Sequence, residues 1–134
     1  MFKITLFALM ALSLASCGGD SGSDDYQLAV QQADAKQAEA ISLAPATPCN
    51  AVQQCANLQL ISAHGNCGAA SYRPYSLASP TADAASAAAA DERALALHAI
   101  SLSPPPNVAC AQSIVAPPTL GCVANTCQAV TPAN

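Results

Sequence analysis

Residues 79–106 read SPTADAASAAAADERALALHAISLSPPP, and this stretch organises the rest of the chain. Ser79-Pro80 is typical of a helix start, because a capping hydroxyl is followed by proline in the first turn. Alanine, leucine and glutamate then favour helix to about Ser101, and the prolines that begin at Pro104 forbid its continuation. We expect one Ala-rich helix, and we expect its Ala87–Ala90 half to protrude because it has little surface to bury.

Of the seven cysteines, Cys17 lies near the N-terminus, and the other six flank this helix, three before it and three after it. If the chain is exported, this even number of cysteines predicts three disulfides, with fifteen possible connectivities. A metal site is the alternative, because His64 lies three residues before Cys67, yet successive cysteines lack the two-residue spacing of common zinc sites. We therefore expect disulfides, with no bound metal and no other cofactor. The six residues are Cys49, Cys55, Cys67, Cys110, Cys122 and Cys127.

The bridges are expected to join the segment before the helix to the segment after it. Neither segment has a core of its own, and bridges between them close loops of ~40 residues or more, which restrict the unfolded chain more than short loops do. The gaps between cysteines are five and eleven residues before the helix and eleven and four after it, a nearly mirror-symmetric pattern that nested pairing would produce. Our preferred set among the fifteen is Cys67–Cys110, Cys55–Cys122 and Cys49–Cys127.

Short strands and turns fill the rest of the segment from residue 49 to residue 130. Leu58-Gln59-Leu60 alternates as a strand does. The segment from Cys122 to Cys127 predicts a tight hairpin, with Asn125 at the position that tolerates a positive φ. We expect a small, disulfide-rich α+β domain over 49–130, with short strands and a hairpin cross-linked around one Ala-rich helix, and a tail at 131–134.

The N-terminus has the features of an export signal over residues 1–16. Met1-Phe2-Lys3 supplies one positive charge, and Ile4–Leu14 form an uncharged apolar run that ends before the small residues Ala15 and Ser16. A membrane-spanning helix needs ~20 apolar residues, so this run is too short to span a bilayer. We therefore expect the mature chain to begin at Cys17.

The sequence Leu14-Ala15-Ser16-Cys17 resembles the lipobox of bacterial lipoproteins. The resemblance implies that the Cys17 thiol receives a diacylglycerol and that several acyl chains anchor the protein stably to a membrane. In lipoproteins of this kind, an aspartate after the cysteine implies retention in the inner membrane. Gly18 occupies that position here, so the resemblance implies an outer-membrane protein facing the periplasm or the surface. An ordinary export signal with an incidental cysteine is the alternative.

Residues 17–48 are expected to connect the anchor to the domain. Gly18–Asp25 contain only Gly, Ser and Asp, a composition typical of a flexible tether. Tyr26–Leu43 are rich in helix formers with a weak apolar stripe, which favours a frayed spacer helix over a partner-binding helix. Pro45 and Pro48 then end this helix.

The segment from Cys49 to Cys127 resembles a group of small six-cysteine exported bacterial domains. Cys67-Gly68 and the closing cysteine triplet match the pattern of that group, as do two tyrosines and a serine, although Ala69-Ala70 replace its usual Gly-Pro. The resemblance implies a shared fold and brings no activity with it. The matching tyrosines and serine are Tyr72, Tyr75 and Ser76.

The charge balance argues against nucleic-acid binding. The formal net charge is −4, and only Lys36, Arg73 and Arg93 stay positive once the signal is removed. Phosphate contacts from Lys and Arg supply most of the affinity for nucleic acid. We therefore expect no nucleic-acid partner.

No catalytic constellation is evident in the sequence. His64 and His98 are isolated, and no nucleophile elbow surrounds Ser71 or Ser76. Asp91-Glu92-Arg93 is typical of a solvated helix surface. We expect a protein that is not an enzyme.

Two non-enzymatic functions fit these features. The first is a membrane-anchored interaction module that presents a disulfide-stabilised face to a protein partner in the cell envelope. The second is a protease-inhibitor-like domain, in which the Cys110–Cys122 loop with Ile114, Val115 and Pro117-Pro118 would be held at both ends by bridges.

Overall fold

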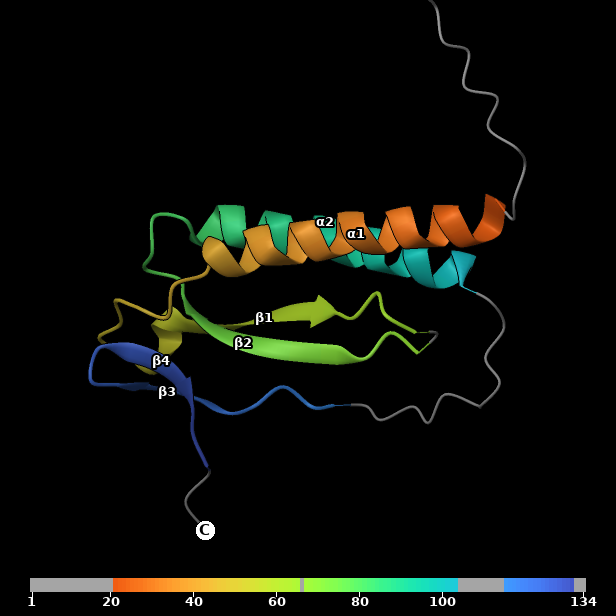
Figure 1. Ribbon diagram of the computed structural model, residues 1–134. Helices are drawn as coiled ribbons and strands as arrows, with labels where there is room; N and C mark the ends of the chain where they lie inside the picture. Colours follow the sequence, from red (N-terminus) through yellow and green to blue (C-terminus); the bar gives the residue numbers. More distant parts are fainter. Residues whose placement is uncertain (1–20, 66, 104–114, 132–134) are drawn as a thin grey trace, which may run out of the picture.

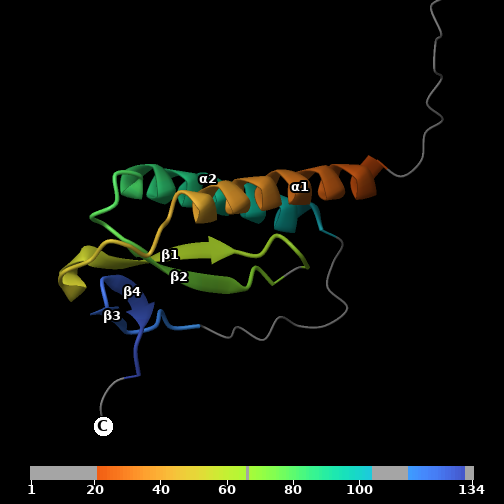
Figure 2. The same cartoon turned by 60° about the vertical axis from the view of Figure 1, so that its left-hand side comes forward.

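The computed structural model describes residues 21–65, 67–103 and 115–131. The helices α1 and α2 lie side by side over one face of the β1–β2 hairpin, and the β3–β4 hairpin lies on the other side (Figures 1 and 2). This arrangement confirms the predicted small α+β fold. The elements are α1 (Ser21–Ser42), the 3-10 turn η1 (Val52–Gln54), β1 (Cys55–Ile61), β2 (Ala70–Ser76), α2 (Ala82–Leu102), β3 (Leu120–Val123) and β4 (Thr126–Ala129).

Helix α2 follows the predicted bounds closely, but its alanine-rich half does not protrude. Ala88 and Ala89 are 4% and 3% exposed and pack with Leu58, Leu60 and Tyr75. The expectation that Ala87–Ala90 would protrude was wrong because alanine, although it buries little area, permits close contact between a helix and its neighbours.

Helix α1 is part of this core, whereas a spacer helix was expected. Ala40 packs with the start of α2, while Ala29, Val30 and Ala33 pack with Ala96 and Ala99 near its end. The two helices are therefore antiparallel neighbours along their length. Because both contacting faces are lined by alanine, a weak apolar stripe is enough to bury α1.

The beginning of α1 also differs from the expected tether. The helix already includes Asp24 and Asp25, which lie in the stretch predicted to be flexible. Negative charge near a helix N-terminus is favourable because it faces the positive end of the helix dipole. Among the described residues, neither helix has the length and apolarity needed to cross a membrane.

Strands β1 and β2 pair antiparallel, with Cys55 opposite Ser76 and Ile61 opposite Ala70. Leu58 is buried against the helices. Because side chains alternate along a strand, Cys55 and Asn57 are directed to the opposite face, where Cys55 is bridged to Cys127 of β4 and Asn57 bonds Pro118. The predicted strand at Leu58–Leu60 is confirmed and is longer than expected.

Strands β3 and β4 form the predicted tight hairpin. Cys122 lies opposite Cys127 and Val123 opposite Thr126. Ala124 and Asn125 have φ values of 49° and 63°. Positive φ at both central residues is the signature of the two-residue turn whose twist matches a hairpin, so Asn125 occupies the position predicted for it.

Candidate functional site

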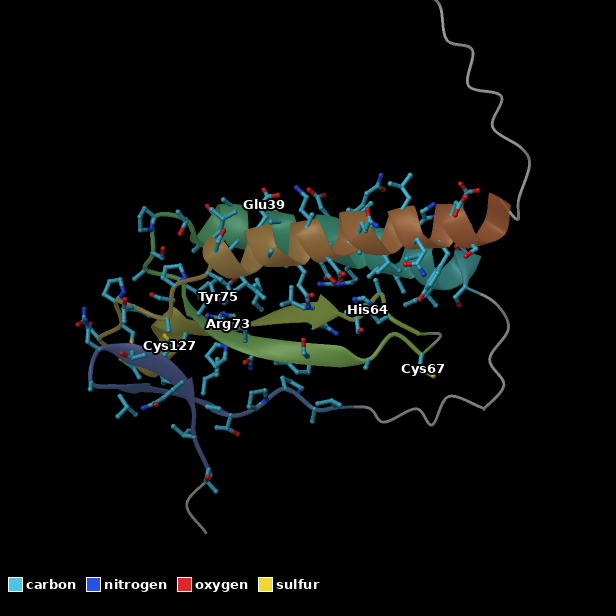
Figure 3. All side chains as sticks on the ribbon, in the orientation of Figure 1. Glu39, His64, Cys67, Arg73, Tyr75 and Cys127 are labelled. Atoms are coloured by element: carbon cyan, nitrogen blue, oxygen red, sulfur yellow. A yellow bond between two sulfur atoms is a disulfide. The ribbon has the colours of Figure 1, made fainter. Side chains whose placement is uncertain are left out.

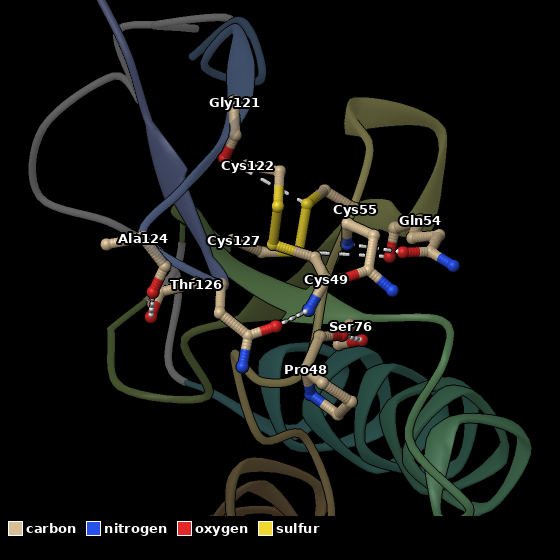
Figure 4. Close-up of a disulfide and its surroundings, with 12 residues drawn as sticks. Pro48, Cys49, Gln54, Cys55, Ser76, Gly121, Cys122, Ala124, Thr126 and Cys127 are labelled. Carbon is tan, nitrogen blue, oxygen red and sulfur yellow. Dashed lines mark hydrogen bonds between the residues drawn. A yellow bond between two sulfur atoms is a disulfide. The ribbon is translucent and has the colours of Figure 1, made fainter.

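Two disulfides, which together we call the clamp, attach the β3–β4 hairpin to the segment that precedes and begins β1. They join Cys49 to Cys122 and Cys55 to Cys127, at sequence separations of 73 and 72 residues (Figure 4). Both bridges connect the chain before α2 to the chain after it, which confirms the predicted crossing. Disulfides form and persist outside the reducing cytoplasm, so the folded chain belongs to an extracytoplasmic compartment.

The predicted pairs Cys49–Cys127 and Cys55–Cys122 were wrong. Cys122 and Cys127 lie directly opposite each other in the hairpin, so both sulfurs reach the same place and their order along the chain does not decide their partners. The position in which the hairpin docks determines which cysteines pair. Cys127 donates its N–H to Ala46 O (2.8 Å), and Cys49 donates its N–H to Asn125 O (3.2 Å) and to its side-chain Oδ1 (3.1 Å).

Ser76 connects the linker of residues 45–48, which leads to Cys49, to the end of β2. Its side chain is fully buried, its Oγ donates to Pro48 O, and its N–H donates to Pro45 O at 2.9 Å. Leu77 N–H donates to Gln54 O at 2.7 Å, which connects η1 to the residue after β2. These bonds fix the linker and η1 independently of the disulfides. The matching serine of the six-cysteine pattern therefore has a structural role here.

The clamped end exposes several apolar side chains. Val52, Leu77 and Val123 are 45%, 49% and 47% exposed. They come from elements that contact one another, since η1 contacts β3 and Gln54 of η1 is bonded to Leu77. We call these three residues the clamp surface. The turn residues Ala124 and Asn125 beside Val123 are exposed as well.

The remaining predicted cysteines lie elsewhere. Cys67 is exposed, is itself disulfide-bonded, and lies at the end of the β1–β2 hairpin away from Cys127 (Figure 3). Its predicted partner, Cys110, and the predicted lipidation site, Cys17, are outside the described residues. The Cys67–Cys110 bridge and the lipid anchor therefore stay predictions.

His64 has an acidic partner that the sequence did not indicate. Its Nε2 lies 3.0 Å and 3.1 Å from the two carboxylate oxygens of Asp34 on α1. Ser76 lies at the opposite end of β2 from the β1–β2 connection that carries His64 and donates to Pro48 O. The structure therefore does not bring Ser76 to His64.

His98 lies near the C-terminal end of α2, beside an open hollow between the two helices. Leu28 and Leu102 border this hollow and are 55% and 36% exposed. Asp25 and Gln32 supply polar atoms to the same rim. The hollow therefore has a mixed lining at the end of the molecule that carries the beginning of α1.

Glu92 is buried, although the sequence predicted a solvated surface. It is 1% exposed, and its Oε2 and Oε1 accept the N–H of Ile61 at 3.2 Å and 3.3 Å. Burial raises the pKa of this carboxyl above its usual value, while the bond from Ile61 opposes that rise. No local pattern reveals this role, because the partner is a backbone group at the end of β1.

Three cysteine sulfurs of the clamp have the proximity of metal ligands. The Sγ atoms of Cys49, Cys55 and Cys127 lie within 4.8 Å of one another. A thiolate is the form of cysteine that binds metal, and in the oxidised clamp these sulfurs are engaged in disulfides.

Comparisons with protein-family models, with curated proteins and with solved structures find no match for this chain.

Proposed function

We propose that this chain is a lipid-anchored protein of the bacterial cell envelope whose clamp surface binds a protein partner, in a binding role and not a catalytic one. The observation that carries the proposal is the pair of disulfides that cross α2 and fix the β3–β4 hairpin beside exposed apolar side chains. A surface that is already rigid loses little conformational entropy when it binds.

The lipid anchor is supported by the Leu14–Cys17 motif and by the position of α1. Helix α1 begins at Ser21, so only three residues separate it from Cys17. A chain extends by at most about 3.6 Å per residue, which limits this connection to roughly 14 Å. The proposed anchor therefore holds the helical layer close to the membrane, and Gly18 supports the outer membrane as the destination.

Metabolic labelling tests the anchor. A clickable palmitate analogue should label the wild-type chain in the bacterial envelope and should not label Cys17→Ser. Cys67→Ser is the control for loss of a cysteine elsewhere, and we expect it to be labelled as the wild type is. Equal labelling of Cys17→Ser would overturn the proposed anchor.

Site-specific photo-crosslinking tests the clamp surface. A photo-reactive residue in place of Val123 should give a discrete protein adduct in the envelope of the native host. The same residue in place of Ala94, on the exposed side of α2, is the matched control and should give none. Absence of an adduct at Val123, or the same adduct from both positions, would contradict a partner site at the clamp.

A protease-inhibitor-like role is the second candidate. The segment from Val115 to Thr119 has no regular secondary structure, and Val115 is 47% exposed. Asn57 Nδ2 donates to Pro118 O at 3.0 Å, and Cys122 is bridged just beyond, so the C-terminal end of the predicted inhibitory loop is fixed. Inhibition of one protease in a panel at stoichiometric concentration would support this role, and rapid cleavage by all of them would exclude it.

A further inference from the structure

The two disulfides bring three cysteine sulfurs into one cluster, and the fourth is bonded to one of the three. The Sγ atoms of Cys49, Cys55 and Cys127 lie within 4.8 Å of one another, and Cys122 Sγ is bonded to that of Cys49. In a zinc tetrathiolate each sulfur lies about 2.3 Å from the ion, so the sulfurs are roughly 3.8 Å apart in tetrahedral geometry. The cluster therefore needs only small movements to reach the size of such a site.

Contacts other than the disulfides hold these cysteines in place. Cys49 and Cys127 donate their backbone N–H groups to Asn125 O and Ala46 O at 3.2 Å and 2.8 Å. The other two cysteines are held by strand pairing in the two hairpins. Reduction breaks the sulfur–sulfur bonds and leaves all of these contacts chemically intact, so the four thiols stay close together.

Each bridge joins one buried cysteine to one half-buried cysteine. Cys49 and Cys127 are each 2% exposed, whereas their respective partners Cys122 and Cys55 are half-buried. A thiolate breaks a disulfide by attacking one of its sulfurs. The half-buried cysteine of each bridge is therefore the one at which a thiolate would attack.

We propose that reduction of both bridges converts the clamp into a binding site for one thiophilic divalent ion such as Zn²⁺, held by Cys49, Cys55, Cys122 and Cys127. Each bridge takes two electrons and two protons from a dithiol, which is itself oxidised to a disulfide. The four thiols then bind one Zn²⁺ and release four protons. The site joins segments more than 70 residues apart in the sequence, so the spacing of neighbouring cysteines does not reveal it.

Cobalt titration tests this site directly. The exported chain with Cys17→Ser is reduced with a phosphine under argon and titrated with Co²⁺. One equivalent should produce the intense visible bands of tetrahedral, thiolate-bound cobalt, and one equivalent of Zn²⁺ should abolish them. Far-ultraviolet circular dichroism should retain the helical signal, and the oxidised chain should give no such bands.

Two pairs of serine substitutions assign the ligands. Cys67→Ser with Cys110→Ser leaves the four proposed ligands intact, so the cobalt spectrum should be unchanged. Cys49→Ser with Cys122→Ser removes two ligands, so the bands should be lost. The proposal is overturned if the reduced chain binds no cobalt, if the first pair abolishes the bands, or if the second pair leaves them unchanged.

Discussion

Glu92 brings a carboxylate into the interface between α2 and β1. Burial raises its pKa, the hydrogen bond from Ile61 and the charge of Arg93 lower it, and the nearby Asp34 raises it further. The net direction is upward from the usual value of 4.5. A buried carboxyl that is hard to ionise makes the stability of the fold depend on pH.

The sign of this dependence follows from proton binding. Because the folded chain binds the Glu92 proton more tightly than the unfolded chain, this contribution to stability is fully present below pH 4.5 and is lost as the pH rises through the raised folded pKa. Glu92→Gln should remove that loss and flatten the dependence. Free energies of unfolding in urea, measured from pH 4 to pH 7, check this, with the exposed Asp83→Asn as control. If the free energy of unfolding of Glu92→Gln depended on pH as steeply as that of the wild type, Glu92 would not be the group responsible.

Glu92→Ala tests the hydrogen bond separately from the charge. It leaves the Ile61 N–H without its acceptor and should reduce the free energy of unfolding by about 1–3 kcal/mol. The same denaturant measurement at neutral pH checks this value. If Glu92→Ala were as stable as the wild type, the carboxylate would have no role in holding the end of β1.

At the scale of elements, the packing of α1 against α2 depends on small side chains. Ala96 and Ala99 are each 0% exposed, and they pack with Ala29 and Ala33 of α1. Interhelical distance depends on the side chains at the contact, and alanine allows the shortest approach that keeps a Cβ. The packing therefore tolerates no larger residue at these positions without moving one helix.

Ala96→Leu should destabilise the fold through overpacking, by about 1–3 kcal/mol. Ala94→Leu changes the same helix by the same side chain at an exposed position and should have little effect. Thermal and urea unfolding of the two variants provide the comparison. Equal stabilities would mean that the two helices are not in close contact along this stretch.

The sequence predicted the elements better than their contacts. The proline boundaries and the Asn125 turn have local physical causes, so α2 and the last hairpin were correctly predicted. The burial of α1 and of Glu92 depends on neighbours distant in the sequence. A weak stripe of alanine and a carboxylate beside an arginine look solvated until another element covers them.

Much of the candidate site could also be predicted from the sequence, but the pairing of its cysteines could not. Six cysteines in an export context and the lack of a separate core in each half indicated bridges across α2, and both described bridges confirm this. Mirror-symmetric spacing suggested nested pairs, but Cys122 and Cys127 are side by side in the hairpin. Their partners are then set by how the hairpin docks, which spacing does not encode.

At the scale of the whole molecule, the two bridges are expected to act non-additively. While one bridge is present, the other closes a ring of only about a dozen residues, so its loss should cost ~3 kcal/mol. The last remaining bridge closes a loop of about 70 residues, so its loss should cost a further ~4 kcal/mol. Loss of both bridges should therefore cost more than the sum of the two single losses, and the hydrogen bonds that dock the hairpin then keep the domain folded.

Alanine substitution of the pairs Cys49 with Cys122 and Cys55 with Cys127, singly and together, measures this effect. All variants carry Cys67→Ser and Cys110→Ser, so that the bridge of Cys67 does not contribute. Urea unfolding should remain cooperative in all three variants, and loss of both pairs should lower the free energy of unfolding by more than the sum of the two single losses. Equal, additive losses would contradict a shared clamp.

The clamp consists of the Cys49–Cys122 and Cys55–Cys127 bridges. Digestion of the unreduced chain at Val52 and Val123, which are 45% and 47% exposed, separates the two cysteines of each segment. Mass spectrometry of the linked peptides should then join Cys49 to Cys122 and Cys55 to Cys127, and six hydrogens should be missing from the intact exported chain if Cys67 also pairs with Cys110. Peptides that join Cys49 to Cys127 and Cys55 to Cys122, or Cys49 to Cys55, would contradict the structure.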